Sequence, residues 1–521
     1  MNKFTIAYKY NLIMVLTISL VLVSLNFAFQ GNKGFNLADE GFLWYGAQRV
    51  VAGEVPLRDF MAYDPGRYYW IGALFALTGH TGVMAARVAS TILEYCALCV
   101  GLFLIVDSVK LRKNDQIPFV IVSAVTMILW MFTLYKIFDI CMSIFLIGIL
   151  SFLIKNPTPK HYLLTGIGVG AVAVFGRNHG LYGALGSMGV MVWLHIHGRA
   201  TPGIMKGALL WGIGVIIGFS PIIFMAIFVP GFADAFRDSI DFLIKRKSTN
   251  LPLPVPWFWT VPLADMKALP AMRAILVGLF FMSVPIFGIS LLLSVIWRRI
   301  KGLETPPTLV AAAFMSLPYA HYVFSRADME HLSLGIFPLL IGVMVIAANS
   351  TTKVRWLLAT PLLLASYGCL YASQPARVCS GKHECVGVQI SGSTLWVSAD
   401  MADNVKMLHQ LADQYAPNGR SFVVVPFWPG AYALLGQKSP MWDIYALFPH
   451  SEDFEKQEIE RIKAAKPGFV LLWNLALDGH DDLKFKNTHP LINRYIMDNF
   501  SPVPYMQNPD YQIYKERTSS Q

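Results

Sequence analysis

Apolar runs about as long as a lipid bilayer is thick recur along this chain, and they constrain its fold more than any other feature. A helix that crosses the hydrocarbon core of a membrane needs about 20 predominantly apolar residues. Of the 521 residues, 55% are hydrophobic and only 14% are charged. That composition is typical of a chain that crosses a membrane many times, and not of several soluble domains. The sequence therefore predicts a polytopic α-helical membrane protein.

Eleven segments have the length and composition of a membrane span. We expect them at residues 11–29, 83–108, 117–134, 137–154, 162–176, 181–197, 207–229, 274–297, 308–324, 332–348 and 355–372. The first follows a short basic start, exceeds the roughly 7–15 residues of a signal-peptide core and lacks a clear cleavage site. We therefore interpret it as an uncleaved span, and an odd number of spans places the two termini on opposite sides.

Basic residues predict the orientation of these spans. They gather on the side of the N-terminus, in "KLRK" (110–113), Lys155 with Lys160, Arg199 with Lys206, "RRIK" (298–301) and Lys353 with Arg355. By the positive-inside rule that side is the cytoplasm. We therefore expect a multi-pass protein of the bacterial inner membrane, in contact with membrane lipids, with a cytoplasmic N-terminus. The net charge of +10 is explained by this topology and does not indicate a nucleic-acid partner.

The C-terminal residues have the composition of a soluble domain. "SFVVVPF" and "GFVLLW" predict short buried strands, while "ADMADNVKMLHQLADQYA" and "EDFEKQEIERIKAAK" predict amphipathic helices. Alternating strands and helices favour a small α/β domain on the periplasmic side. We expect two domains: a transmembrane bundle over 1–372, which includes a first periplasmic loop at 30–82, and the α/β domain over 373–521.

Cysteine usage agrees with a periplasmic location of that second domain. Cys379 and Cys385 lie close together in "CSGKHEC", just after the last expected span. Disulfides persist in oxidising compartments such as the periplasm. We therefore predict a disulfide between these two cysteines.

The first periplasmic loop concentrates carboxylates in "NLADEGFLWYGAQRVVAGEVPLRDFMAYDPGRYYW", residues 36–70. Asp39 and Glu40 begin a predicted helix, and capping of that helix is a sufficient structural explanation for acids at these positions. A local salt bridge is the corresponding explanation for the charged residues that follow. These are Arg58, Asp59, Asp64 and Arg67.

Two further polar clusters fall on the same expected side of the membrane. In "FSRADMEHL", Ser325 and Asp328 resemble a capping box, while Asp328 and His331 share one helix face within reach of Arg326. "GRNHGL" (176–181) supplies Arg177 and His179 at another helix end. Cationic side chains at the lip of a membrane bundle suit a lipid phosphate.

Carboxylates on one loop and cations on others match the requirements of sugar transfer from a lipid phosphate. A carboxylate can take the proton of the acceptor as general base. The leaving phosphate departs as an anion, and positive groups stabilise it.

The stretch "LADEGFLWYGAQRVVAGEVPLRDF…YDPGRYYW" resembles the first outer loop of the GT-C glycosyltransferases. It is most similar to the bacterial relatives of protein O-mannosyltransferases and to the lipid A aminoarabinose transferase. The resemblance implies an inverting transfer on the extracytoplasmic face, with Asp39 as general base and Glu40 as its neighbour. Asp59 and Asp64 match later acidic positions. "RADMEH" resembles an Arg/Asp/His turn of that family, which implies that Arg326 and His331 bind phosphate.

We therefore expect a glycosyltransferase that uses a polyprenyl-phosphate-linked sugar and acts on a glycan, on lipopolysaccharide or lipid A, or on a protein. No cofactor is required, although Asp39, Asp59 and Asp64 could hold a divalent cation such as Mg²⁺ or Mn²⁺. The oligosaccharyltransferase branch carries a Trp-Trp-Asp-Tyr-Gly motif. We interpret its nearest counterpart here, "MWDIY" at 441–445, as coincidental, so that transfer to peptide asparagine is not expected.

Two other functions stay open at this point. A lipid-linked glycan transporter or flippase would carry ionisable residues in mid-membrane, where Glu94 is the clearest acid of this chain. An O-antigen polymerase or ligase would also act on the outer face, but it depends less on an acidic pair after the first span.

Overall fold

The computed structural model describes residues 3–108, 113–196, 202–246, 251–379, 385–504 and 510–517. Residues 110–112 and Arg199, which contributed to the predicted orientation, lie outside these ranges. The chain divides into two compact units. The first consists of Met1–Gly31 and Val88–Arg377, and the second of Asn32–Arg87 and Val378–Gln521.

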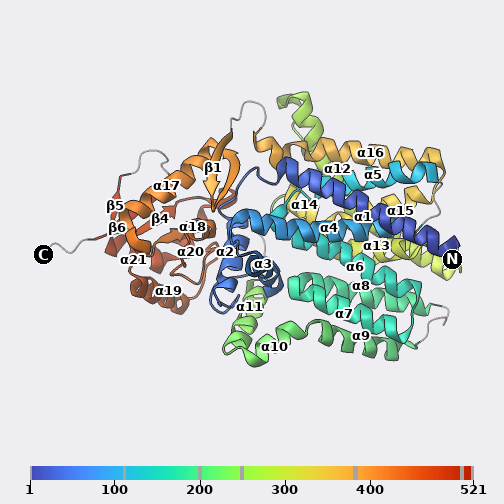
Figure 1. Cartoon of the computed structure of the whole chain (residues 1–521), viewed down its shortest axis with the longest axis horizontal. Coiled ribbons are helices and arrows are strands. Elements are labelled where there is room, and N and C mark those ends of the chain that lie inside the picture. The colour runs from blue at the N-terminus through green and yellow to red at the C-terminus, as the bar shows by residue number, and fades with distance from the viewer. Residues whose placement is uncertain are drawn as a thin grey trace. The chain divides into compact units, whose positions relative to one another are not determined.

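The first unit is a bundle of helices (Figure 1). Its helices are α1 (Lys3–Gln30), α4 (Val83–Asp107, from Val88 on), α5 (Lys113–Trp130), α6 (Ile137–Lys155), α7 (Pro159–Phe175), α8 (Arg177–His195), α9 (Ile204–Gly218), α10 (Ser220–Phe228), α11 (Phe232–Arg246), α12 (Ala268–Ile300), α13 (Pro307–Ser325), α14 (Met329–Gly335), α15 (Phe337–Ala348) and α16 (Thr352–Leu370). In Figure 1, α5 runs alongside α16 and α7 alongside α9.

Each of the eleven expected spans coincides with a helix or with a bent pair of helices. Five described helices are long and apolar enough to cross a membrane, and the number rises to seven if each bent pair is one span. The bent pairs are α9 with α10, at 54°, and α14 with α15, at 53°. The segments that match α5, α7, α8 and α13 are not among these seven, so that a total of eleven crossings stays a prediction.

Glycines allow α7 and α9 to pack backbone against backbone. A Cβ on Gly166 would lie 2.0 Å from the carbonyl oxygen of Trp211, and one on Gly214 would lie 2.2 Å from that of Leu163. Small residues are the usual means by which membrane helices approach this closely, because lipid supplies no hydrophobic force between them.

The second unit combines the first loop with the C-terminal residues. The loop forms α2 (Asp39–Val51) and α3 (Pro65–Thr78). The C-terminal part contains the hairpin β1 (Cys385–Ile390) and β2 (Ser393–Ser398), and a four-stranded sheet in the order β3 (Val423–Val425), β4 (Phe469–Trp473), β6 (Tyr511–Glu516) and β5 (Phe500–Val503). β3 and β4 are parallel, and the other pairs are antiparallel. The helices are α17 (Ala399–Tyr415), α18 (Pro429–Leu435), α19 (Glu452–Ala465), α20 (Phe485–Thr488) and α21 (Pro490–Asn499).

The two strands and two helices that the sequence predicts in this unit are present. "SFVVVPF" contains β3 and "GFVLLW" contains β4, and both strands are buried. The two amphipathic segments form α17 and α19. A disulfide joins Cys379 to Cys385.

Contacts group the first loop with the C-terminal residues, whereas the predicted boundary at 372/373 assigned it to the bundle. α2 crosses α18 at two glycines, where a Cβ on Gly41 would lie 2.4 Å from the backbone nitrogen of Gly430. The same nitrogen donates a 2.9 Å hydrogen bond to the carbonyl oxygen of Leu37. The glycine of "DEG" therefore permits a backbone contact that any side chain would block.

The α7–α9 contact predicts different effects of alanine at two glycines of α9. We expect Gly214→Ala to lower the midpoint of thermal unfolding in detergent, because overpacking typically costs about 1–3 kcal/mol. Gly212→Ala on the same helix should leave the midpoint unchanged or raise it, since no atom lies within 4 Å of a Cβ there and Ala favours helix. Equal effects of the two substitutions would contradict the packing described.

Candidate functional site

Asp39 is the first residue of α2, but its carboxylate does not cap that helix. The side chain of Asn36 does so instead, with Oδ1 accepting hydrogen bonds from the backbone N–H groups of Ala38 (2.8 Å) and Asp39 (3.2 Å). Oδ1 of Asp39 accepts a 2.9 Å hydrogen bond from the hydroxyl of Tyr445. The side chain is partly exposed. The carboxylate of Asp39 therefore bonds Tyr445, and Asn36 supplies the capping hydrogen bonds that were the structural explanation for Asp39.

Glu40 has a different environment from its neighbour. It is buried and forms a bidentate ion pair with Arg87, with Oε1–Nε and Oε2–Nη2 distances of 2.6 and 2.8 Å. Nη2 of Arg87 also donates to the carbonyl oxygen of Gly34, at 2.7 Å. A buried ion pair with two hydrogen bonds fixes the conformation of the backbone around it. Glu40 thus holds the start of α2 in place.

Two other aromatic rings pack near Tyr445, the partner of Asp39. The ring of Phe42 lies 4.9 Å from that of Tyr63 and 5.4 Å from that of Tyr445, measured between centroids. Rings at these edge-on separations attract one another beyond the area they bury. The result is an apolar wall beside a carboxylate.

The segment that carries Tyr445 is bonded to the first loop at several points. The indole N–H of Trp442 donates to the carbonyl oxygen of Leu57 (3.0 Å), and the backbone N–H of Met61 donates to that of Trp442 (2.9 Å). The backbone N–H of Ser439 donates to the hydroxyl of Tyr45, at 3.0 Å. The position of the Tyr445 hydroxyl is therefore fixed relative to α2.

The remaining charged residues of the loop are engaged within it. Nε and Nη2 of Arg58 donate to the two carboxylate oxygens of Asp59 at 2.9 and 2.7 Å. Burial raises the pKa of Asp59, but the hydrogen bonds from Arg58 and from the backbone N–H of Val55, together with the charges of Arg58 and Lys438, hold that pKa below its usual value. Asp64 is the buried N-cap residue of α3, and Arg67 in the next turn lies with its guanidinium 5.3 Å from the ring of Tyr63. The salt bridge expected as the structural explanation is thus present between Arg58 and Asp59.

In the bundle, Asp328 joins Arg326 to His331. It is the N-cap residue of α14, and its Oδ1 accepts from both the backbone N–H and Nδ1 of His331, each at 2.8 Å. Its Oδ2 accepts a 2.7 Å hydrogen bond from Nε of Arg326. Nη1 of Arg326 reaches the carbonyl oxygen of Leu251, at 3.1 Å. The Arg/Asp/His turn is therefore one connected unit, as its spacing predicted.

His179 lies deeper and is fully buried. Its Nε2 is 2.7 Å from Oδ1 of Asp139, and its Nδ1 is 2.8 Å from the hydroxyl of Tyr319. The hydroxyl of Tyr322 donates to the same oxygen of Asp139, at 3.1 Å, and its ring lies 6.0 Å from that of His331. Both ring nitrogens of His179 are occupied by protein atoms, which suits it to position its neighbours and not to contact a ligand.

Two further cations lie near the ends of α6 and α8. Lys136 forms a 3.1 Å ion pair with Glu330, whose other oxygen accepts a 2.6 Å hydrogen bond from Tyr135. Arg177 begins α8, and its Nη1 donates to the hydroxyl of Ser239 on α11, at 2.7 Å. Lys136 is thus paired with the residue that precedes His331 in the sequence, whereas Arg177 is tied to α11.

Several of these partners were not identified from the sequence. Lys136 and Asp139 lie at a turn between two expected spans. Charged residues next to apolar runs can indicate a functional position. The sequence does not indicate the other two partners. Arg87 lies 47 residues from Glu40, and Tyr445 lies 406 residues from Asp39.

The divalent cation considered for Asp39, Asp59 and Asp64 has no prearranged ligand set there. Within the ranges that the structure describes, these three carboxylates are not among the groups whose ligand atoms gather within 4.8 Å of one another. Asp39 and the Arg326–His331 turn belong to different compact units, so their convergence on one substrate stays a prediction.

The Arg/Asp/His turn predicts a dependence of stability on pH. Burial raises the pKa of Asp328, but the hydrogen bonds and charge of His331 lower that pKa to about 2. A carboxyl with a depressed pKa stabilises the fold above its unfolded value, near 4, and this stabilisation is lost as the pH falls toward 2. We expect Asp328→Asn to cost about 2 kcal/mol at pH 7 and progressively less below pH 4, as measured by unfolding in detergent. A cost that is independent of pH would contradict this assignment.

Comparison with solved structures shows a likeness in fold at low sequence identity. No protein-family model matches the sequence, and no curated protein matches it. Among solved structures, ArnT from Cupriavidus metallidurans bound to undecaprenyl phosphate aligns with 97% of this chain and 98% of its own, at 10% identity and a TM-score of 0.53.

Two other structures are less similar. The oligosaccharyltransferase of Archaeoglobus fulgidus, tethered to an acceptor peptide, aligns over 98% of this chain and 74% of its own, at 10% identity and a TM-score of 0.45. The mycobacterial arabinofuranosyltransferase AftD aligns over 97% and 40%, at 13% identity and a TM-score of 0.44. The alignment with ArnT extends over nearly the full length of both chains. This chain therefore shares its fold with ArnT.

Proposed function

We propose that this chain is an inverting glycosyltransferase that moves a sugar from a polyprenyl-phosphate-linked donor to an acceptor on the periplasmic face of the bacterial inner membrane. The observation that carries the proposal is the state of Asp39. Its carboxylate lies at the N-terminus of α2 and accepts a hydrogen bond from Tyr445, while Asn36 caps the helix. The shared fold with ArnT, whose structure contains undecaprenyl phosphate, supports the choice of donor.

The proposed reaction assigns separate tasks to the two clusters. Asp39 takes the proton from an acceptor hydroxyl or amine as that group attacks the anomeric carbon. The bond from that carbon to the phosphate oxygen breaks on the opposite face, and the lipid phosphate leaves as an anion. A carboxylate is suited to the first task, and fixed cations are suited to the second.

Within these clusters, residues that touch substrate differ from residues that position them. We assign donor phosphate binding to Arg326, His331 and Arg177, since their side chains stand at helix ends. Glu40, through its ion pair with Arg87, and His179, through Asp139 and Tyr319, are positioning residues. Asp59, Asp64, Arg58, Arg67 and Asp328 shape the two clusters, and the acceptor stays open among glycans, lipid A and proteins.

Loss of the proposed base should abolish transfer. Using purified protein and a labelled polyprenyl-phosphate sugar, we expect Asp39→Asn to reduce sugar transfer at least about a hundredfold, the usual scale for a general base. Asp400→Asn is the matched control, because Asp400 is also an acid in the first turn of a helix, α17, but is exposed. Near-normal transfer by Asp39→Asn would remove Asp39 from this role. Movement of intact lipid-linked sugar across vesicles without transfer would favour a transporter.

Loss of a phosphate contact should instead weaken binding of the donor. We expect Arg326→Ala to raise the KM for the donor about tenfold or more, because a charge-assisted hydrogen bond to phosphate is lost. Arg237→Ala, which removes an exposed ion pair with Asp234 on α11, should leave KM unchanged. If donor affinity is the same in both variants, Arg326 does not bind the phosphate and only stabilises the turn through its ion pair with Asp328.

A further inference from the structure

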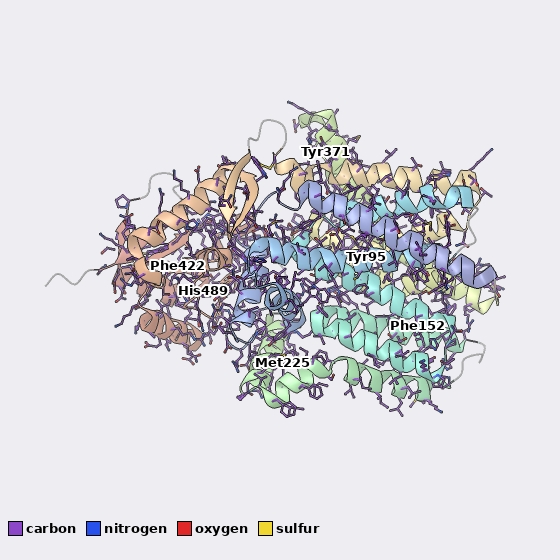
Figure 2. The ribbon with its side chains drawn as sticks, viewed as in Figure 1. Tyr95, Phe152, Met225, Tyr371, Phe422 and His489 are labelled. Carbon is purple, nitrogen blue, oxygen red and sulfur yellow. A yellow bond between two sulfur atoms is a disulfide. The ribbon has the colours of Figure 1, made fainter. Side chains whose placement is uncertain are left out.

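Three ligand-type side chains converge in the second unit, and none of them is proposed to take part in catalysis. Asp443 and His450 lie in the segment between α18 and α19, and His489 directly precedes α21. Oδ2 of Asp443 is 3.2 Å from Nε2 of His450 and 3.3 Å from Nε2 of His489. Figure 2 labels His489 among the packed side chains of this unit, where it is 0% exposed.

Two atoms of this cluster are buried without a hydrogen bond. They are Oδ2 of Asp443 and Nε2 of His489. A buried carboxylate oxygen requires a positively charged partner, because burial removes the water that would otherwise solvate its charge. The close contacts among these atoms therefore need a further explanation.

The other ring nitrogen of His489 is also engaged. Its Nδ1 forms a 2.9 Å hydrogen bond with the hydroxyl of Thr488, which lies 3.4 Å from the carbonyl oxygen of Phe485. This bond is compatible with a proton on Nδ1, the tautomer in which the lone pair of Nε2 faces the carboxylate of Asp443. A cation between Nε2 and that carboxylate would bind to both groups.

The distances fit a metal ion shared by the three side chains. Zn²⁺ binds imidazole nitrogen and carboxylate oxygen at about 2.0–2.2 Å in tetrahedral geometry, so that two ligand atoms stand about 3.3–3.5 Å apart. The two measured separations, 3.2 and 3.3 Å, are close to this range, and one ligand atom from each residue lies within 4.8 Å of the others.

We propose that Asp443, His450 and His489 bind a divalent cation of the Zn²⁺ class. Two imidazoles and one carboxylate suit Zn²⁺ better than Mg²⁺ or Ca²⁺, which prefer oxygen ligands. Three protein ligands leave a fourth position for water. His450, whose side chain is 14% exposed, gives the ion a route from solvent.

Such an ion would tie the segment 441–450 to the start of α21. The same segment is held from its other side by Glu458, whose Oε2 accepts from the backbone N–H groups of Trp442 (2.8 Å) and Asp443 (3.2 Å). Trp442 and Tyr445 in this segment contact the first loop. The cation would thus be structural, and it does not depend on the proposed function.

Metal binding by the full-length chain tests the proposal. The protein is purified in detergent with a tag that lacks histidine, stripped with a chelator and titrated with Zn²⁺ or Co²⁺. We expect about one ion per chain, the visible absorption bands of four-coordinate Co²⁺, and a higher unfolding midpoint with Zn²⁺, because a ligand of the folded state alone stabilises it. His489→Gln and His450→Gln should each weaken binding at least about tenfold.

The control is His480→Gln, which removes an exposed histidine beside Asp482 and should bind Zn²⁺ as the wild type does. If His489→Gln does not fold, the more exposed His450→Gln and the Co²⁺ spectrum of the wild type decide the question. A wild-type chain that takes up no ion at micromolar Zn²⁺, or variants that bind it equally well, would overturn the proposal and identify the cluster as an ion pair of protonated histidines.

Discussion

The contact between Gly41 and Gly430 is the constraint on which the second unit depends. A side chain at either position would meet backbone atoms of the other helix, so that α2 and α18 can cross only where both residues are glycine. This crossing brings the first loop against the C-terminal residues and allows the hydrogen bonds from Trp442 and Tyr445 to form. The acid that begins α2 is thereby oriented by a residue from the far end of the chain.

Adjacent acids acquire separate tasks because other groups satisfy the helix ends. Asn36 caps α2, which leaves the carboxylate of Asp39 to the Tyr445 hydroxyl, while Glu40 turns to the buried Arg87. Adjacent helical residues point about 100° apart, so Glu40 can support the structure while Asp39 has the position that its proposed role as base requires. In the bundle, Asp328 caps α14 and also holds Arg326 and His331 together.

What the sequence predicts well in this chain is local. Apolar length locates the helices of the bundle, and alternation with turn residues locates β3, β4, α17 and α19, because both patterns depend on neighbours a few residues apart. The Arg326–Asp328–His331 turn and the Cys379–Cys385 disulfide are local in the same sense. Partners distant in sequence carry no such pattern. Nothing near Asp39 indicates Tyr445, and nothing in "MWDIY" itself indicates that it supplies contacts to the loop and a ligand of the proposed metal site. The predicted domain boundary assigned the loop to the bundle for the same reason.

A structure of the full chain with a bound polyprenyl phosphate would test the central claim most directly. The account predicts that the phosphate lies within hydrogen-bonding distance of the guanidinium of Arg326, and that the carboxylate of Asp39 faces the same cavity, with room between them for one sugar. A phosphate bound elsewhere, or an Asp39 carboxylate turned toward bulk solvent with no cavity before it, would contradict the account.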